Sequence, residues 1–179
     1  MDKIREYITP YADILAWCLM PNHFHLMILI NHTELDRSPE KKIGPDTKKR
    51  SLNNSIAIVL RSYTNFINKE QNRTGSLFRQ KTKSVCLDPE NGVMPSWYII
   101  NGVSKINIQY PEIQYPQVCF NYIHYNPLVS GLVKKISAWE FSSAPELLGI
   151  TNYGLVNKER VDEIGLKMQC TNRSDEPIR

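Results

Sequence analysis

Two histidines, His23 and His25, stand at the start of an apolar run that ends at Ile30. Residues 24–30 have the length and composition of a buried strand, and Pro21-Asn22 before them indicates a turn. Side chains alternate across a strand, so both imidazoles share one face, about 6.5–7 Å apart along the backbone. Imidazole is the commonest metal ligand, and the spacing fits a two-ligand clamp for one metal ion. Two histidines packed in a core or at a strand end would show the same spacing.

The opposite face of this strand carries only apolar side chains. Phe24, Leu26, Ile28 and Ile30 alternate with the histidine face, so we expect them to pack on the core. The histidine face is then left for a ligand. Two imidazoles do not make a metal site, so a third ligand must come from elsewhere in the chain.

A phenol and an amide lie together in a later helical segment. Tyr122 and Asn126 are four residues apart, which makes them neighbours on one helical face. His124 points roughly 200° away from Tyr122 and does not share that face. The pair offers the two imidazoles a nucleophile and a third ligand. Helix packing by the tyrosine and C-capping by the asparagine would produce the same pattern.

The elements that position these groups can be predicted in chain order. Apolar residues at helical spacing predict a short helix from Met1 to about Tyr11, interrupted near Pro10. A strand from about 14 to 20 follows, and its short connection to the histidine strand predicts an antiparallel pair. The Tyr122 helix is predicted over 117–125, with Pro116 in its first turn and Asn126-Pro127 weakening or ending it.

A second, longer helix is predicted from Ser51, which can cap it, to a turn near Gly75. Its buried stripe consists of Leu52, Ile56, Val59, Leu60, Tyr63, Phe66 and Ile67, and its polar face carries Arg61. Residues 31–50, with a basic cluster and no apolar period, are predicted to be an exposed mobile loop. A solvated loop is the favoured reading of that cluster over a nucleic-acid contact.

An alternating basic segment follows the second helix. Arg79, Lys81 and Lys83 share one face of a strand predicted over 77–85, beside Phe78. Cations that bind phosphates and an aromatic ring that stacks on a base would suit a single-stranded nucleic acid. A solvent-facing edge strand protected from pairing by lysines would show the same pattern. With Arg61, the three cations are the candidate DNA-binding residues. Residues 88–115 are predicted to be an insertion with a short strand at 97–100.

Composition restricts the class of protein without naming it. The 179 residues are 41% hydrophobic and 22% charged, as in an ordinary globular domain, and the net charge of +4 is compatible with a phosphate partner. The four cysteines are widely spaced without a Cys-x-x-Cys motif, so we expect reduced packing residues. The apolar runs are too short to cross a bilayer, and a cytoplasmic protein without a membrane partner is predicted.

Four ordered motifs together resemble a known family. They are Met20-Pro21-Asn22-His23-Phe24-His25-Leu26, Thr74-Gly75-Ser76-Leu77-Phe78, Tyr122-Ile123-His124-Tyr125-Asn126-Pro127-Leu128-Val129-Ser130-Gly131-Leu132-Val133 and Trp139-Glu140-Phe141-Ser142-Ser143. This order, over about residues 13–149, is similar to that of the single-tyrosine HUH transposases, and in particular of the REP-associated tyrosine transposases.

The resemblance implies a ferredoxin-like α+β domain with helices packed on a central antiparallel sheet. It implies that His23, His25 and Asn126 bind a divalent metal, Mg²⁺ or Mn²⁺, and that Tyr122 is the nucleophile. The implied activity is nicking and strand transfer of single-stranded or hairpin DNA through a covalent 5′-phosphotyrosine, usually by a homodimer. A free tyrosine has a pKa of about 10, so positive charge near the phenol would assist it.

The chain departs from the family pattern at its start. Family members have a strand before the first helix, whereas here Met1 opens almost directly into that helix, so we expect domain 1–150 to lack this strand. Residues 151–179 are predicted to form a short helix and a polar tail. Two other functions remain open: a decayed or domesticated protein that binds hairpin DNA without cutting it, and an unrelated metal hydrolase. The lack of a nearby carboxylate counts against the hydrolase.

Overall fold

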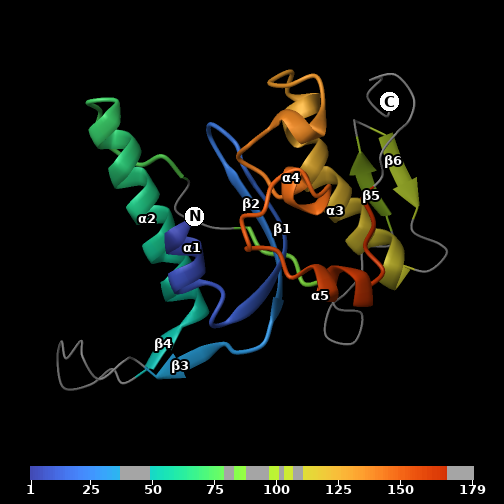
Figure 1. Ribbon diagram of the computed structural model, residues 1–179, viewed down its shortest axis with the longest axis horizontal. Coiled ribbons are helices and arrows are strands. Elements are labelled where there is room, and N and C mark those ends of the chain that lie inside the picture. The colour runs from blue at the N-terminus through green and yellow to red at the C-terminus, as the bar shows by residue number, and fades with distance from the viewer. Residues whose placement is uncertain (37–48, 79–82, 88–96, 101–102, 107–110, 169–179) are drawn as a thin grey trace.

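The computed structural model describes residues 1–36, 49–78, 83–87, 97–100, 103–106 and 111–168, and it has an α+β fold (Figure 1). The elements are α1 (Asp2–Tyr7), β1 (Ala12–Leu19), β2 (Phe24–Ile30), β3 (Glu34–Asp36), β4 (Lys49–Ser51), α2 (Leu52–Glu70), β5 (Trp97–Ile100), β6 (Val103–Ile106), α3 (Pro111–Val129), the 3-10 helix η1 (Ile136–Ala138), α4 (Ala144–Leu147) and α5 (Lys158–Glu163). Among these residues the strands form three separate antiparallel pairs, β1–β2, β3–β4 and β5–β6.

The β1–β2 hairpin is the centre of the fold and confirms the predicted antiparallel pair. Cys18 pairs with His25 and Leu19 with Phe24, so the turn between the strands leads directly into the histidine segment. The other edge of β1 is bridged to Val156 and to Ser142. Strand β1 therefore lies between β2 and the C-terminal part of the chain, and nearly all of its side chains are buried.

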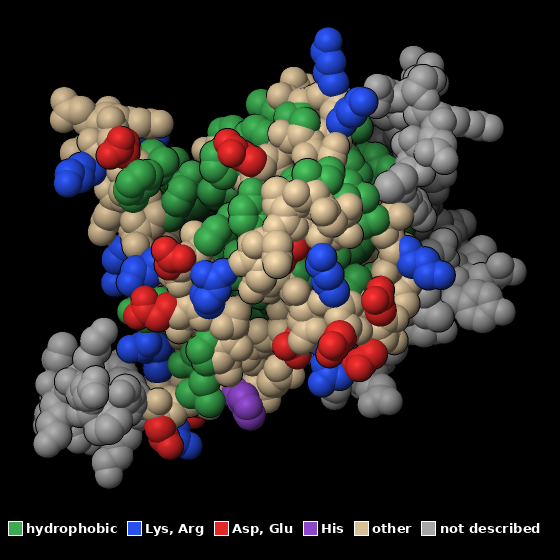
Figure 2. All heavy atoms as spheres, in the orientation of Figure 1, with side chains coloured by type: hydrophobic (Ala, Val, Ile, Leu, Met, Phe, Trp, Pro, Cys, Tyr) green, Lys and Arg blue, Asp and Glu red, His purple; other side chains and the backbone are tan. Residues whose placement is uncertain are grey.

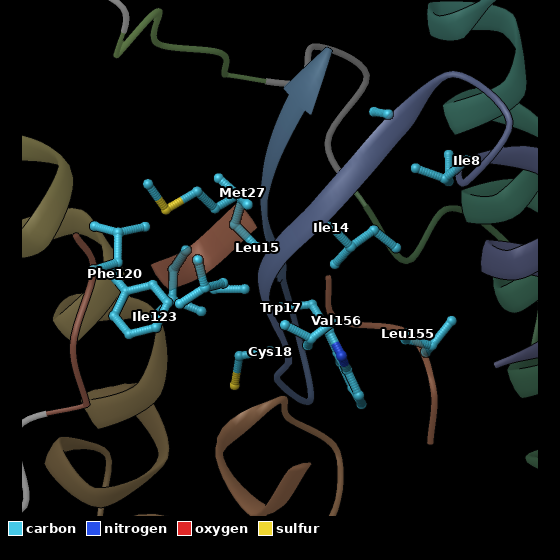
Figure 3. Packing of buried hydrophobic residues seen from close by; sticks show 14 of the residues in the cluster. Ile8, Ile14, Leu15, Trp17, Cys18, Met27, Phe120, Ile123, Leu155 and Val156 are labelled. Carbon is cyan, nitrogen blue, oxygen red and sulfur yellow. The ribbon is translucent and has the colours of Figure 1, made fainter. Parts of the chain in front are cut away.

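The hydrophobic core packs on both faces of β1. Figure 3 shows Met27, Phe120 and Ile123 on the side of α3, and Leu155 and Val156 on the other side of the strand. These contacts hold α3 against the hairpin that carries the histidines. They also include the segment after residue 150 in the same core, together with α5.

Both faces of β2 contribute side chains to the core. Met27, on the histidine face, is only 7% exposed, because α3 covers that face. On the other face Ile30 is 52% exposed, and Phe24, Leu26 and Ile28 are only partly buried. The expected packing of this face on the core is therefore confirmed for Phe24, Leu26 and Ile28, which lie against the core cluster, and is wrong for Ile30.

Helix α2 begins where its sequence predicts. The Ser51 hydroxyl accepts a hydrogen bond from the Asn54 N–H at 3.3 Å, as an N-cap does. The predicted stripe is confirmed in part: Leu52 is buried, and Ile56 and Val59 are half-buried against the core. Toward the end of the helix it is wrong at Phe66, which is 58% exposed. Figure 1 shows α2 beside α1 at one side of the hairpin, and Figure 2 shows hydrophobic atoms at the surface along it.

Several predicted boundaries change. The first helix ends at Tyr7, before Pro10. The predicted loop 31–50 contains β3 and β4, which pair with each other, and residues 37–48 lie outside the described part. The predicted strand 77–85 is wrong at 77–78 and 83–85, which have no strand conformation, and 79–82 are not described.

The region after residue 88 also differs from its prediction. The short strand at 97–100 is confirmed as β5, whereas its partner β6 was not predicted. Helix α3 starts at Pro111, inside the predicted insertion 88–115, and continues to Val129. Pro116 and Pro127 both lie within the helix, so neither marks an end. The rest of this region that is not in β5, β6 or α3 is not described.

The cysteines in the described ranges are free thiols. Cys18 is buried and Cys119 half-buried, as expected for packing residues, but Cys86 is exposed. No helix in the described ranges combines the length and apolar character that a membrane span needs. Charged side chains of both signs gather over α5 (Figure 2), where Arg160 bonds Glu163 and Asp13.

Candidate metal and nucleophile site

The two histidines come from the β1–β2 turn and the first residues of β2. The Met20 N–H donates to the His23 carbonyl at 2.8 Å, which closes the turn, and His25 pairs with Cys18 in the ladder. Their ring centroids are 4.7 Å apart and the ring planes are nearly perpendicular, at 81°. Alternation along the strand therefore places both imidazoles on one face, as predicted.

The Asn126 side chain reaches the same point from α3. Its Nδ2 lies 2.8 Å from His25 Nε2 and 3.4 Å from His23 Nε2. Ligand atoms at adjacent corners of an octahedron around a cation about 2.1 Å away are about 3 Å apart. The separations between the amide and the imidazoles bracket that value, so the donor set fits a small divalent cation.

The orientation of the amide decides which atom faces the imidazoles. In the structure the Asn126 NH₂ group donates to both Nε2 atoms, and the Ser130 hydroxyl donates to Oδ1 at 3.4 Å. A cation would require Oδ1 in place of Nδ2, which a half-turn of the terminal amide provides. The Ser130 hydroxyl can accept from the amide after that rotation, because a hydroxyl both donates and accepts.

Both imidazoles are held in the neutral form that a metal ligand needs. Burial lowers the pKa of His23, and burial together with the neighbouring His23 lowers the pKa of His25 to about 4. His23 Nδ1 lies 2.5 Å from Asn22 Oδ1, and because an amide oxygen only accepts, Nδ1 carries the proton. The lone pair of His23 is therefore on Nε2, directed at Asn126. A partner on the second ring nitrogen is the usual way in which proteins orient a ligating histidine.

Tyr122 lies one helical turn before Asn126 and at the open side of the site. Its ring centroid is 5.2 Å from that of His25, with an interplanar angle of 79°. The residue is 56% exposed, whereas Asn126 is only 9% exposed. The site therefore combines two half-buried imidazoles and a buried amide with an accessible phenol.

Clusters of other metal-binding residues are not found in the described part of the chain. No three His, Cys, Asp or Glu side chains come together there, and the polar group beside the two histidines is the Asn126 amide. His32 lies at the far end of β2, where its N–H bonds the Tyr11 carbonyl, and it takes no part in the site.

The predicted DNA-binding residues are not brought together with Tyr122 by the described elements. Arg61 is exposed on α2, which packs on α1 and β4, and Lys83 is exposed in a segment without strand structure. Arg79 and Lys81 lie outside the described residues. The predicted basic ladder therefore has no strand to support it at its described positions.

Two polar residues of the site were not identified from the sequence. Asn22 orients His23, and a turn residue next to a candidate ligand could have been considered for that role. Ser130 is four residues after Asn126 and bonds its side chain. Helical spacing would have revealed it, but the predicted helix ended too early.

Comparison with known proteins adds no identification. The chain matches no protein-family model, and neither curated proteins nor solved structures gave a significant match. The function must therefore be argued from the residues and their geometry.

Proposed function

We propose that the protein is a DNA transposase of the single-tyrosine HUH type, which nicks single-stranded DNA and transfers the strand in a metal-dependent reaction. The observation that carries this proposal is the meeting of Tyr122 and Asn126 with His23 and His25, from segments about a hundred residues apart. These are the four residues that the family resemblance assigns to nucleophile and metal ligands. Core packing alone does not require such a set of polar side chains.

The chemistry proposed for Tyr122 is an in-line displacement at phosphorus. A bond forms between the phenol oxygen and the phosphorus, the bond to the 3′ oxygen breaks, the phenol proton leaves to solvent and the departing 3′ oxygen takes up a proton. The 5′-phosphotyrosine keeps the energy of the diester, so a later 3′-hydroxyl can reverse the attack and rejoin strands. A bound Mg²⁺ or Mn²⁺ would neutralise charge on the phosphate and orient it.

The chain's own groups support this assignment. Two neutral imidazoles that direct their Nε2 lone pairs at one point could bind Mg²⁺ or Mn²⁺. Mn²⁺ is the better match, since it tolerates nitrogen ligands better than Mg²⁺ does. The high exposure of Tyr122 leaves space for a polymer substrate. A ferredoxin-like arrangement of the domain, action as a homodimer on hairpin DNA and a cytoplasmic location are further parts of this proposal.

The test is a covalent adduct. The protein is incubated with Mn²⁺ and a 5′- or 3′-labelled pool of single-stranded hairpins with randomised flanks, and SDS-resistant protein–DNA species are resolved on a gel. We expect the adduct to carry the 3′ label and not the 5′ label. The reason is that the tyrosine stays attached to the 5′-phosphate of the fragment that ends at the original 3′ end. Tyr122→Phe should abolish it, and Tyr125→Phe, which removes a neighbouring phenol of the same helix, should not.

The outcomes separate the alternatives. Hairpin binding without an adduct in the wild-type protein favours a binding protein that has lost catalysis. Cleavage of DNA that persists in Tyr122→Phe and stops with EDTA favours a metal hydrolase. An adduct that persists in Tyr122→Phe contradicts the assigned nucleophile.

A further inference from the structure

A buried histidine on α3 faces away from the site. His124 is 1% exposed and lies between Tyr122 and Asn126 in the chain, on the opposite side of the helix. Its Nε2 is 2.7 Å from the hydroxyl of Ser143, just before α4. A buried imidazole in the middle of an otherwise apolar helix face costs stability unless its polar atoms are bonded. The bond to Ser143 gives Nε2 the partner that its burial requires.

Ser143 is in turn bonded to β1 through the main chain. Its N–H donates to the Trp17 carbonyl at 2.9 Å, and the Trp17 N–H donates to its Oγ at 2.9 Å. The hydroxyl also lies 3.1 Å from the Trp17 carbonyl. Because the single hydroxyl hydrogen is donated to the Trp17 carbonyl, the hydroxyl accepts from His124, whose Nε2 carries the proton. His124, Ser143 and Trp17 thus form one buried link from α3 to β1.

The link joins the same two elements that supply the site. Trp17 precedes Cys18, which pairs with His25, and His124 is two residues from both Tyr122 and Asn126. Apolar packing of Phe120 and Ile123 on β1 is not directional, so it defines the register of the helix less sharply than a hydrogen bond does. A slide by one residue rise, about 1.5 Å, would destroy the 2.8 Å approach of Asn126 to His25. A hydrogen bond between fixed atoms prevents that slide.

We propose that His124 and Ser143 are positioning residues, whose buried hydrogen bond sets the register of α3 on β1 and so aligns Asn126 and Tyr122 with the imidazole pair. They touch neither substrate nor cation. The consequence for nicking rests on the proposed function, whereas the consequence for the ligand set depends only on His23, His25 and Asn126.

The test compares variants in Mn²⁺ binding, adduct formation and unfolding. His124→Leu keeps the approximate volume and removes the bond, His124→Gln keeps a polar group able to reach Ser143, and Ser143→Ala removes the other partner. Val161→Ala is the matched control, because Val161 is buried on α5 at the other side of β1. Mn²⁺ binding is measured from the loss of the free Mn²⁺ EPR signal, at a temperature where each variant is folded.

We expect His124→Leu and Ser143→Ala to weaken Mn²⁺ binding about 10–100-fold, the usual effect of removing an outer support of a metal ligand. His124→Gln should restore most of the affinity. Val161→Ala should lose thermal stability without a change in Mn²⁺ affinity, which separates positioning from general destabilisation.

Wild-type affinity in folded His124→Leu and Ser143→Ala would overturn the inference, and so would a loss that Val161→Ala reproduces at equal stability. If neither of the two variants folds, the link is structural only, which also overturns it. Mn²⁺ binding by the wild-type protein without any DNA adduct would contradict the proposed function alone. A wild-type protein that does not bind Mn²⁺ through His23 and His25 would contradict both.

Discussion

Acidification should destabilise this protein through one buried side chain, His124. The imidazole is 1% exposed, and burial lowers its pKa to about 4 from an ordinary value of 6.5. Between these values the unfolded chain binds a proton that the folded protein excludes. The free energy of unfolding therefore falls as the pH drops through 6.5 toward 4, and the loss disappears well above pH 6.5.

The magnitude follows from the two pKa values. With 6.5 in the unfolded chain and about 4 in the folded protein, linkage gives a loss of about 2 kcal/mol between pH 7 and pH 5. Below pH 4 the loss approaches about 3 kcal/mol, since each pKa unit corresponds to roughly 1.4 kcal/mol. This is a large fraction of the roughly 5–15 kcal/mol that stabilises a typical domain.

The assay is urea unfolding of the wild-type protein and of His124→Gln at pH 7 and pH 5, with EDTA present, followed by tryptophan fluorescence. Trp17, buried beside Ser143, provides a signal for this part of the core. His25 also has a lowered pKa and contributes to the pH dependence of stability in both proteins. The informative quantity is therefore the difference between the pH dependences of the two proteins. If the wild-type protein and His124→Gln lose the same stability on acidification, the reasoning about His124 is refuted.

Three further predictions concern stability and use the same unfolding assay. Phe120→Ala, at a position that is 0% exposed, should cost about 3–5 kcal/mol, and a cost below 1 kcal/mol would contradict its place in the core. Ser51→Ala should cost about 1 kcal/mol through loss of the α2 cap, and Ser51→Asp should not. Hydrogen bonds from Asn31 and Asn157 lower the pKa of Asp13, so the wild-type protein should lose stability as the pH falls below the ordinary value of 3.8, and Asp13→Asn should flatten that dependence.

The sequence predicted best where a signal is contained within one segment. The turn and the histidine alternation lie within a few residues of each other, and so do the Ser51 cap and the start of α2. The helical spacing of Tyr122 and Asn126 is equally local. In each case the conformation of one segment decides which side chains share a face.

Prediction failed where a distant segment decides the outcome. Proline lacks an N–H and disfavours the α conformation in the preceding residue, so Pro127 predicted an end to the Tyr122 helix. In the structure Pro127 is fully buried among the core residues of α3, and the helix continues to Val129. Burial of the helix face outweighs the local cost of the proline. The extra turn brings Ser130 next to Asn126, which the shorter helix could not do.

The exposed apolar residues of β2 and α2 show the same limitation of prediction from local patterns. Alternation reveals which side chains share a face, but only the contacts of the fold decide which face is covered. Met27 on the histidine face of β2 is buried because Phe120 and Ile123 belong to a helix that docks there. We propose that the position of that helix depends on the hydrogen bonds between Trp17 and Ser143, which are 126 residues apart. Ser143 is an ordinary serine in the sequence, and its role arises from two hydrogen-bond partners that no local pattern connects. In this protein the chemical groups are therefore encoded in short motifs, and the alignment of those groups is encoded in single long-range contacts.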